Sequence, residues 1–61
     1  MKFTLDINCD NDAFFLDWRA EVARILEAQV IPRLTNGGID PRDLTLRDTN
    51  GNVVGKAVLT L

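Results

Sequence analysis

Residues 44–61 read LTLRDTNGNVVGKAVLTL, and this stretch decides the fold because it carries a strong hairpin signal. Asn50-Gly51 is the best two-residue loop of type I′, in which both central positions need positive φ. The loop predicts two antiparallel strands on either side of it. The pairs it predicts are Thr49 with Asn52, Leu46 with Gly55, and Leu44 with Ala57.

The apolar pattern of the same stretch agrees with this register. Directly opposed residues of a hairpin share one face of the sheet. The residues predicted to share the apolar face are Leu44, Leu46, Val53, Ala57, Leu59 and Leu61. Val54 and Val58 are then predicted to lie on the opposite face. Turn chemistry and side-chain alternation are independent signals, so their agreement is the firmest local prediction in the chain.

Residues 2–8 (KFTLDIN) predict another strand, because Phe3, Leu5 and Ile7 alternate with polar residues. The alternation stops at Cys-Asp-Asn-Asp, where Asx side chains favour turns by bonding their own backbone. We expect residues 9–16 to form an ordered loop. Cys9, at the end of the strand in its core-facing phase, is expected to behave as a small buried hydrophobe.

A helix is predicted from Asp12 or Asp17 to Thr35, and we prefer Asp17 as its N-cap. Asn36-Gly37-Gly38 should end it, because glycine accepts the left-handed cap conformation. At 100° per residue, the side chains opposite the apolar face are Asp17, Glu21 and Arg24. The apolar face itself is predicted to carry Phe15, Trp18, Val22, Ile25, Leu26 and Val30.

Pro32 does not fit this helix, because it has no N–H and its ring crowds the carbonyl of Ala28. The helix must therefore kink there or end early. Leu34 continues the apolar spacing beyond the proline, so we expect a bent last turn rather than a break.

These elements predict one domain over residues 1–61, of the α+β class and with the order β-α-β-β. A strand–helix–strand connection makes the first two strands parallel and the crossover right-handed. The third strand then fits best between them. The expected architecture is a three-stranded sheet of order 2-3-1 with one helix packed on one face.

Composition excludes several functions. The chain has no histidine and a single cysteine, so neither a disulfide within the chain nor a closed zinc site is possible, and a cytoplasmic setting is expected. A net charge of −2 does not suit a surface for nucleic acid, and no apolar run is long enough to cross a membrane. Without histidine, tyrosine or a glycine-rich phosphate loop, we predict no catalytic residue and no cofactor.

Acidic and amide side chains are predicted to gather at one end of the sheet. Asp6, Asn8, Asp10, Asp12 and Asp17 imitate the spacing of an EF-hand calcium loop, but its glycine and its glutamate are missing, so no metal site is predicted. Turn formation and capping explain these residues one by one. The functional alternative is a surface that contacts a protein partner or weakly holds a cation, and the residues predicted to form the partner surface are Asp10, Asp12, Asp48, Asn50 and Asn52.

Self-association is expected because a domain of this size buries little surface and carries no disulfide or metal. Val54 and Val58 on the sheet and Ile31 on the helix are the apolar side chains predicted to face away from the core. They are the candidate self-association residues. Sheet edges would offer a second route, through their unpaired backbone groups.

Three segments of the chain resemble a family of short uncharacterised proteins of bacteriophages and prophages. The shared pattern is CDN-x-AF, then E-x-ARIL, then LRD-x-NGN-x-VG, and it spans nearly the whole chain. Pro32 and Ala57, where an aromatic residue would be expected, depart from it. The resemblance implies a phage origin and a place in the host bacterial cytoplasm, and it implies no activity.

The predicted function is therefore that of a small non-catalytic phage or prophage protein that binds a host or phage protein as a homo-oligomer. A structural subunit of a phage complex, whose function is self-association, is the alternative. A nucleic-acid binder is disfavoured by the charge of the chain.

Overall fold

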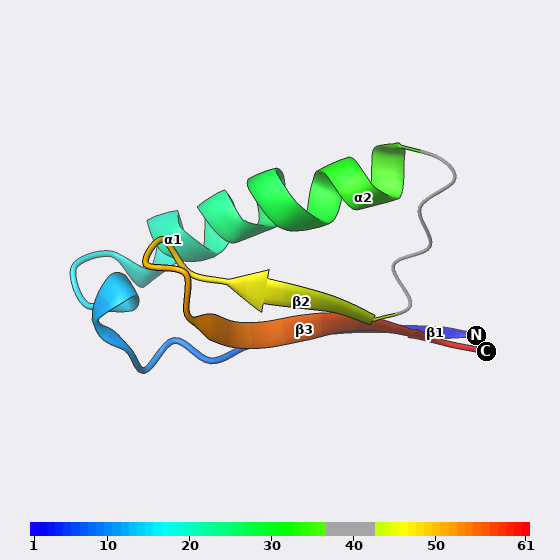
Figure 1. The fold of residues 1–61 in the computed structure, drawn as a ribbon, viewed down its shortest axis with the longest axis horizontal. Helices are drawn as coiled ribbons and strands as arrows, with labels where there is room; N and C mark the ends of the chain where they lie inside the picture. Colours follow the sequence, from blue (N-terminus) through cyan, green and yellow to red (C-terminus); the bar gives the residue numbers. More distant parts are fainter. Residues whose placement is uncertain (37–42) are drawn as a thin grey trace.

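The computed structural model describes residues 1–36 and 43–61 and confirms the predicted α+β fold. A three-stranded sheet carries the helix on one side (Figure 1). The elements in chain order are β1 (Lys2–Ile7), the 3₁₀ turn η1 (Asp12–Phe14), α1 (Trp18–Ile25), the π-helical turn η2 (Leu26–Val30), α2 (Ile31–Thr35), β2 (Asp43–Arg47) and β3 (Val53–Thr60).

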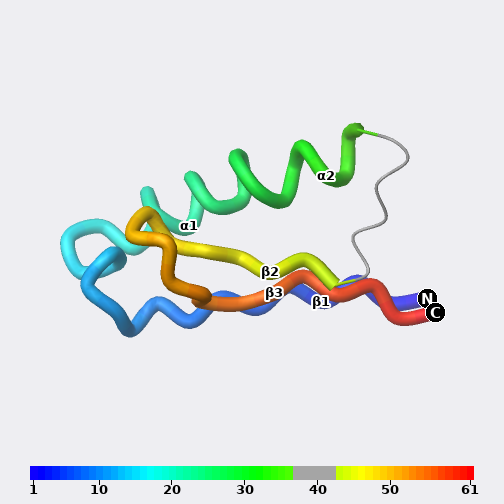
Figure 2. The backbone as a smooth tube through the Cα atoms, viewed as in Figure 1, coloured from blue at the N-terminus to red at the C-terminus, as the bar shows by residue number. Residues whose placement is uncertain are grey.

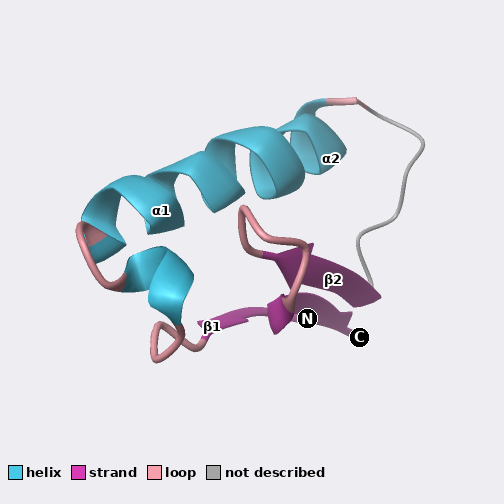
Figure 3. Ribbon diagram, turned by 60° about the vertical axis from the view of Figure 1, so that its left-hand side comes forward, coloured by secondary structure: helices cyan, strands magenta, loops and turns pink. Residues whose placement is uncertain are grey.

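The sheet has the order β1-β3-β2, which is the predicted 2-3-1. β3 runs antiparallel to both neighbours, so β1 and β2 are parallel, as expected. Lys2 pairs with Thr60, and the two chain ends consequently lie side by side (Figure 2). The helix passes over β2 rather than over β1 (Figure 3). β1 is therefore the strand that the helix covers least.

The hairpin has the predicted register in its body and a different turn at its tip. Leu46 faces Gly55 and Leu44 faces Ala57, as predicted. The prediction of a two-residue type I′ loop is wrong, because that turn needs positive φ at both Asn50 and Gly51. Gly51 (φ 87°) is the only described residue with positive φ. The N–H of Gly51 instead donates to the carbonyl of Asp48 at 3.0 Å. The predicted pairing of Thr49 with Asn52 is accordingly absent from the described sheet.

A β-bulge lies directly beside this turn. Leu46 faces Gly55 but Arg47 faces Val53, so Val54 is the extra residue on β3. An extra residue interrupts the alternation of side chains and redirects one of them. Val54 consequently lies in the core with 7% of its surface exposed, and Val53 is 59% exposed. The prediction had these two valines the other way round.

The helix begins where predicted and continues past Pro32. Asp17 caps it by accepting a hydrogen bond from the N–H of Ala20 at 3.2 Å. In η2 the N–H of Ile31 donates to the carbonyl of Leu26, five residues back. This wider turn lies immediately before the proline and makes room for a residue that cannot donate. The predicted stop at Gly37-Gly38 lies outside the described residues.

The buried core lies between the first part of the helix and the hairpin. Cys9 is half-buried against it, in line with its predicted role. Phe15 and Trp18 were expected in the core and are 84% and 54% exposed. Phe15 precedes the helix, so the helical period does not apply to it, and its neighbour in η1 is buried instead. The buried apolar residues are Phe14, Ile25, Val30, Leu46, Val54 and Ala57.

Candidate functional site

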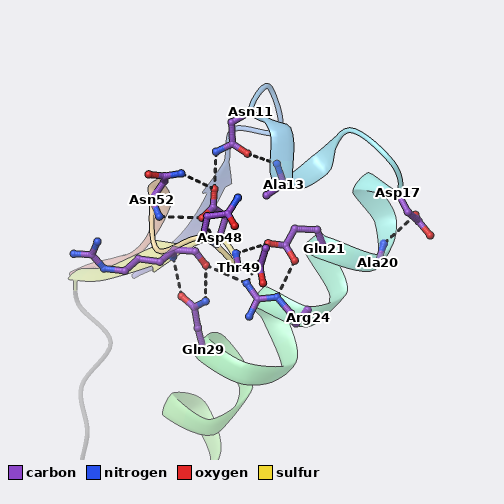
Figure 4. A network of polar contacts seen from close by, with 12 residues as sticks. Asn11, Ala13, Asp17, Ala20, Glu21, Arg24, Gln29, Asp48, Thr49 and Asn52 are labelled. Carbon is purple, nitrogen blue, oxygen red and sulfur yellow. Dashed lines mark hydrogen bonds and ion pairs between the residues drawn. The ribbon is translucent and has the colours of Figure 1, made fainter.

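Asp48 is the centre of a polar network at the turn end of the sheet (Figure 4). Its side chain lies in the hairpin turn, and only 4% of the residue is exposed. Oδ1 accepts the backbone N–H groups of Asn50 and Asn52, each at 2.9 Å. Oδ2 accepts the side-chain amide of Asn11 at 2.7 Å and that of Asn52 at 3.4 Å. The carboxylate therefore organises the turn from inside.

These hydrogen bonds also determine the protonation of Asp48. Burial raises the pKa of a carboxyl group, but here the N–H of Asn52, the amide of Asn11 and the N–H of Asn50 outweigh it. The pKa of Asp48 is consequently lowered from its ordinary value. The group is charged at neutral pH, and every donor around it favours the charged form.

Asn11 connects this turn to the segment that follows β1. Its side-chain nitrogen reaches Asp48, and its Oδ1 accepts the N–H of Ala13 at 3.0 Å. The second bond caps η1, because it satisfies a donor at the start of that turn. One amide thus fixes two segments that are 37 residues apart in the sequence.

Glu21 connects the same turn to the helix. Its carboxylate accepts the N–H of Thr49 at 2.8 Å and pairs with Arg24 through Nε at 2.7 Å and Nη2 at 3.1 Å. The residue is 7% exposed, so the prediction that it lies on the outer helix face is wrong. The bond from Arg24, against the opposing effect of burial, lowers the pKa of Glu21. In the sequence, the signal for the contact between Glu21 and Arg24 is the spacing of three residues between two opposite charges on a predicted helix.

Gln29 binds the outer edge of β2. Its Oε1 accepts the N–H of Arg47 at 2.8 Å, and its Nε2 donates to the carbonyl of Arg47 at 2.6 Å. The side-chain amide thus makes the two bonds that a neighbouring strand would make. The guanidinium of Arg24 adds a longer bond to the same carbonyl, at 3.4 Å. No pattern in the sequence pointed to Gln29.

The predicted partner surface is only partly a surface. Asp48 was placed on it and is buried. Asp10, Asp12, Asn50 and Asn52 are exposed. The structure brings Asn50 and Asn52 to Asp48, whereas the described contacts of Asp10 and Asp12 are local. Residues 1–36 and 43–61 contain no group of three or more His, Cys, Asp or Glu side chains placed to hold a metal ion.

The predicted self-association residues also have different environments. Ile31 is 49% exposed and Val58 is half-buried, whereas Val54 belongs to the core. On the side of Val58, an open hollow of about 640 Å³ lies between the end of β1 and β3. Asp6, Asp10 and Lys56 are among the residues that line it. None of the described helices has the length and apolar character needed to cross a membrane.

A group of exposed apolar side chains that was not predicted lies at the start of the helix. We call Phe15, Leu16 and Trp18 the apolar corner. They are 84%, 92% and 54% exposed, and they lie between η1 and the first turn of α1. Arg19 lies over the indole ring of Trp18, with 5.6 Å between Cζ and the ring centroid. The rest of the corner has no comparable cover among the described contacts.

Comparisons of the chain with protein-family models, with curated proteins and with solved structures found no match. They neither support nor contradict the resemblance to short phage proteins. The two features of the structure that bear on function are the polar network and the apolar corner.

Proposed function

We propose that this chain is a small non-catalytic binding protein that contacts a protein partner through the apolar corner. The observation that carries the proposal is the exposure of Phe15, Leu16 and Trp18 together. Single exposed apolar residues are ordinary, but neighbouring large ones mark interaction sites. Tryptophan is also one of the residue types enriched where binding energy concentrates.

The corner is held in place before any partner binds. On one side, η1 is capped by Asn11, which is itself bonded to the buried Asp48. On the other side, Asp17 caps the helix through the N–H of Ala20. A loop that is already ordered loses less conformational freedom on binding, and this raises its affinity. The role of the polar network in this proposal is to position the apolar corner.

The resemblance to phage and prophage proteins supports a host or phage protein as the partner, met in the bacterial cytoplasm. Asp10 and Asp12 precede the apolar corner in the chain and are exposed. They supply polar groups of the kind that surround the apolar centre of an interface. The negative net charge of the chain favours a partner surface with basic residues around an apolar pocket.

The test compares three immobilised forms of the chain in a bacterial extract: the original chain, Phe15→Ser with Leu16→Ser, and Val53→Ser. Val53 is the matched control, because it is an apolar side chain that is 59% exposed at another place. We expect one stoichiometric partner on the original chain and on the control, and at least a tenfold lower yield on the double variant. Because the changed side chains are exposed, the melting temperatures should agree closely.

Trp18 provides a second measurement, because it is the only tryptophan of the chain. Binding at the corner should shift its emission to shorter wavelength as water leaves the indole ring. A captured protein that binds the double variant equally well, or that leaves the emission unchanged, would show that the corner is not the binding site.

A further inference from the structure

The two edges of the sheet are treated differently by the rest of the chain. Among the described strands β3 is central, so β1 and β2 each have one edge that pairs with no other described strand. Gln29 occupies the edge of β2 at Arg47 through a pair of hydrogen bonds. Along Lys2–Ile7, no comparable side-chain amide is among the described contacts. Exposed edges are templates for another strand, and proteins usually block them.

The backbone groups that β1 turns outward follow from its pairing with β3. The N–H of Asn8 donates to the carbonyl of Val54 at 2.7 Å, so this pair is of the hydrogen-bonded kind. Hydrogen-bonded and non-hydrogen-bonded pairs alternate along an antiparallel ladder. The backbone groups that bond β3 are therefore those of Lys2, Thr4 and Asp6. The N–H and C=O groups of Phe3 and Leu5 face the free edge instead.

A second copy of β1 fits this edge. We propose that the chain forms a symmetric dimer in which β1 pairs antiparallel with β1 of another copy. In such a dimer, the outward-facing N–H and C=O groups of one β1 must bond the outward-facing groups of the other. This condition is met when the two-fold axis passes through Phe3, Thr4 or Leu5. The register centred on Thr4 places Phe3 opposite Leu5 of the other copy. The result is a continuous sheet of six strands, and this inference concerns a surface other than the apolar corner.

Charge selects that register from the three. With the axis at Thr4, Lys2 of each copy lies directly opposite Asp6 of the other, on the sheet face that carries no helix. The other two registers place Lys2 opposite Thr4 or opposite Asn8. Opposite charges across a strand pair are favourable, and like charges are unfavourable. A lysine on an edge strand normally discourages pairing, but here the segment KFTLD is complementary to itself when reversed.

Apolar burial favours the same arrangement. Phe3 and Leu5 lie on the helix side of the sheet and are 43% and 42% exposed, because the helix passes over β2. Pairing of the two edges brings Phe3 and Leu5 of one copy beside those of the other. The line of contact between the two β1 strands, which we call the seam, thus buries apolar surface that is partly exposed in the single chain.

The test exchanges the charges at the seam. Lys2→Glu places like charges opposite each other twice in a dimer, and so does Asp6→Lys. An equal mixture of the two variants restores opposite charges at both positions. Sedimentation should show a dimer of the original chain, a dissociation constant at least tenfold higher for each variant alone, and a dimer in the mixture. Arg33→Glu, which makes the same charge change on the exposed helix end, should leave the dimer intact.

A cross-link checks the register without relying on the charges. Residues that face each other in a non-hydrogen-bonded pair have Cα atoms close enough for a disulfide. In a chain with Cys9→Ser, Thr4→Cys should form a covalent dimer on mild oxidation. Thr45→Cys, exposed on the blocked strand β2, should remain monomeric under the same conditions.

Three results would overturn the proposal. The first is a monomer of the original chain at high micromolar concentration. The second is a mixture of the charge variants that forms no more dimer than its components, while circular dichroism shows both to be folded. The third result is equal cross-linking of the Thr4→Cys and Thr45→Cys chains. Asp6→Lys places two lysines side by side on β1 and β3, and if this variant does not fold, the cross-linking experiment alone decides the proposal.

Discussion

Asp48 holds two backbone segments in relation to one another although it lies in a turn. Its carboxylate orders the hairpin tip through Asn50 and Asn52, and it fixes the segment before the helix through Asn11. A charge enclosed in this way is stable only while its donors remain in place. The neighbouring Glu21 adds the helix to the same assembly through Thr49.

The acid sensitivity of the fold should follow from this residue. The pKa of Asp48 is lowered on folding, so the unfolded chain takes up a proton first as the pH falls. The stability that the Asp48 carboxylate contributes is then complete at pH values above 3.8, the ordinary pKa of the group. This stability is lost as the pH falls below that value. Glu21, whose pKa is also lowered, acts in the same direction from near 4.5.

Asp48→Asn should lower the melting temperature at pH 7 by several degrees, because an amide cannot accept all the bonds that the carboxylate accepts. The difference from the original chain should narrow between about pH 4 and pH 2. Thermal melts across this range measure both effects, with Asp12→Asn as a control for the loss of one exposed carboxylate. A difference that stays constant down to pH 2 would contradict the role given to the charge.

The sequence indicated that Asx residues would gather at this end, and they do. It did not indicate that Asp48 would be enclosed. The bond that encloses it joins Asn11 to a residue 37 positions away, and local pattern carries no information on such a contact. Asp48 was therefore assigned to a surface, on chemistry that suits a turn equally well.

The hairpin shows how two local departures can cancel. The wider turn moves the pairing by one residue, and Arg47 faces Val53 as a result. The bulge at Val54 moves it back, so Leu46 and all residues beyond it have the predicted partners. The turn signal and the side-chain alternation together predicted the body of the hairpin correctly. They could not show the bulge, because Val53 and Val54 are adjacent and both apolar, so either of them could face the core.

Two neighbouring substitutions should separate these arrangements. Val54→Asp places a charge in the core and should reduce the free energy of unfolding by about 3 kcal/mol or more. Val53→Asp, on a side chain that is 59% exposed, should change it by less than about 1 kcal/mol. Urea denaturation measures both. Equal losses, or a larger loss for Val53→Asp, would argue against the bulge.

At the scale of the whole molecule, the sequence indicated the architecture more completely than the packing. Fold class, strand order and the start of the helix all followed from the sequence, because they depend on local periodicity and on connection rules. The path of the helix over β2 did not, because it depends on which side chains meet.

Because Gln29 occupies the edge of β2, it should limit self-association of the chain to the edge of β1. In Gln29→Ala, the N–H of Arg47 becomes available and its C=O keeps only the longer bond from Arg24, so the sheet gains a second edge to which another copy can add. We expect light scattering to show species larger than a dimer, whereas Glu27→Ala on the exposed helix face should not differ from the original chain. An unchanged mass for Gln29→Ala would mean that this side chain does not guard the edge.

The π-helical turn η2 has a consequence for how the length of this chain can vary. A helix does not normally tolerate the loss of one residue, because everything beyond the deletion rotates by about 100°. Here the bond from Ile31 to Leu26 already encloses one residue more than a regular turn. Removal of the exposed Ala28 would return the ladder to regular spacing and leave both flanking halves in their present orientation. A homologue that is one residue shorter within the helix would therefore have its alignment gap within residues 26–30, ahead of Pro32, and would keep the same fold.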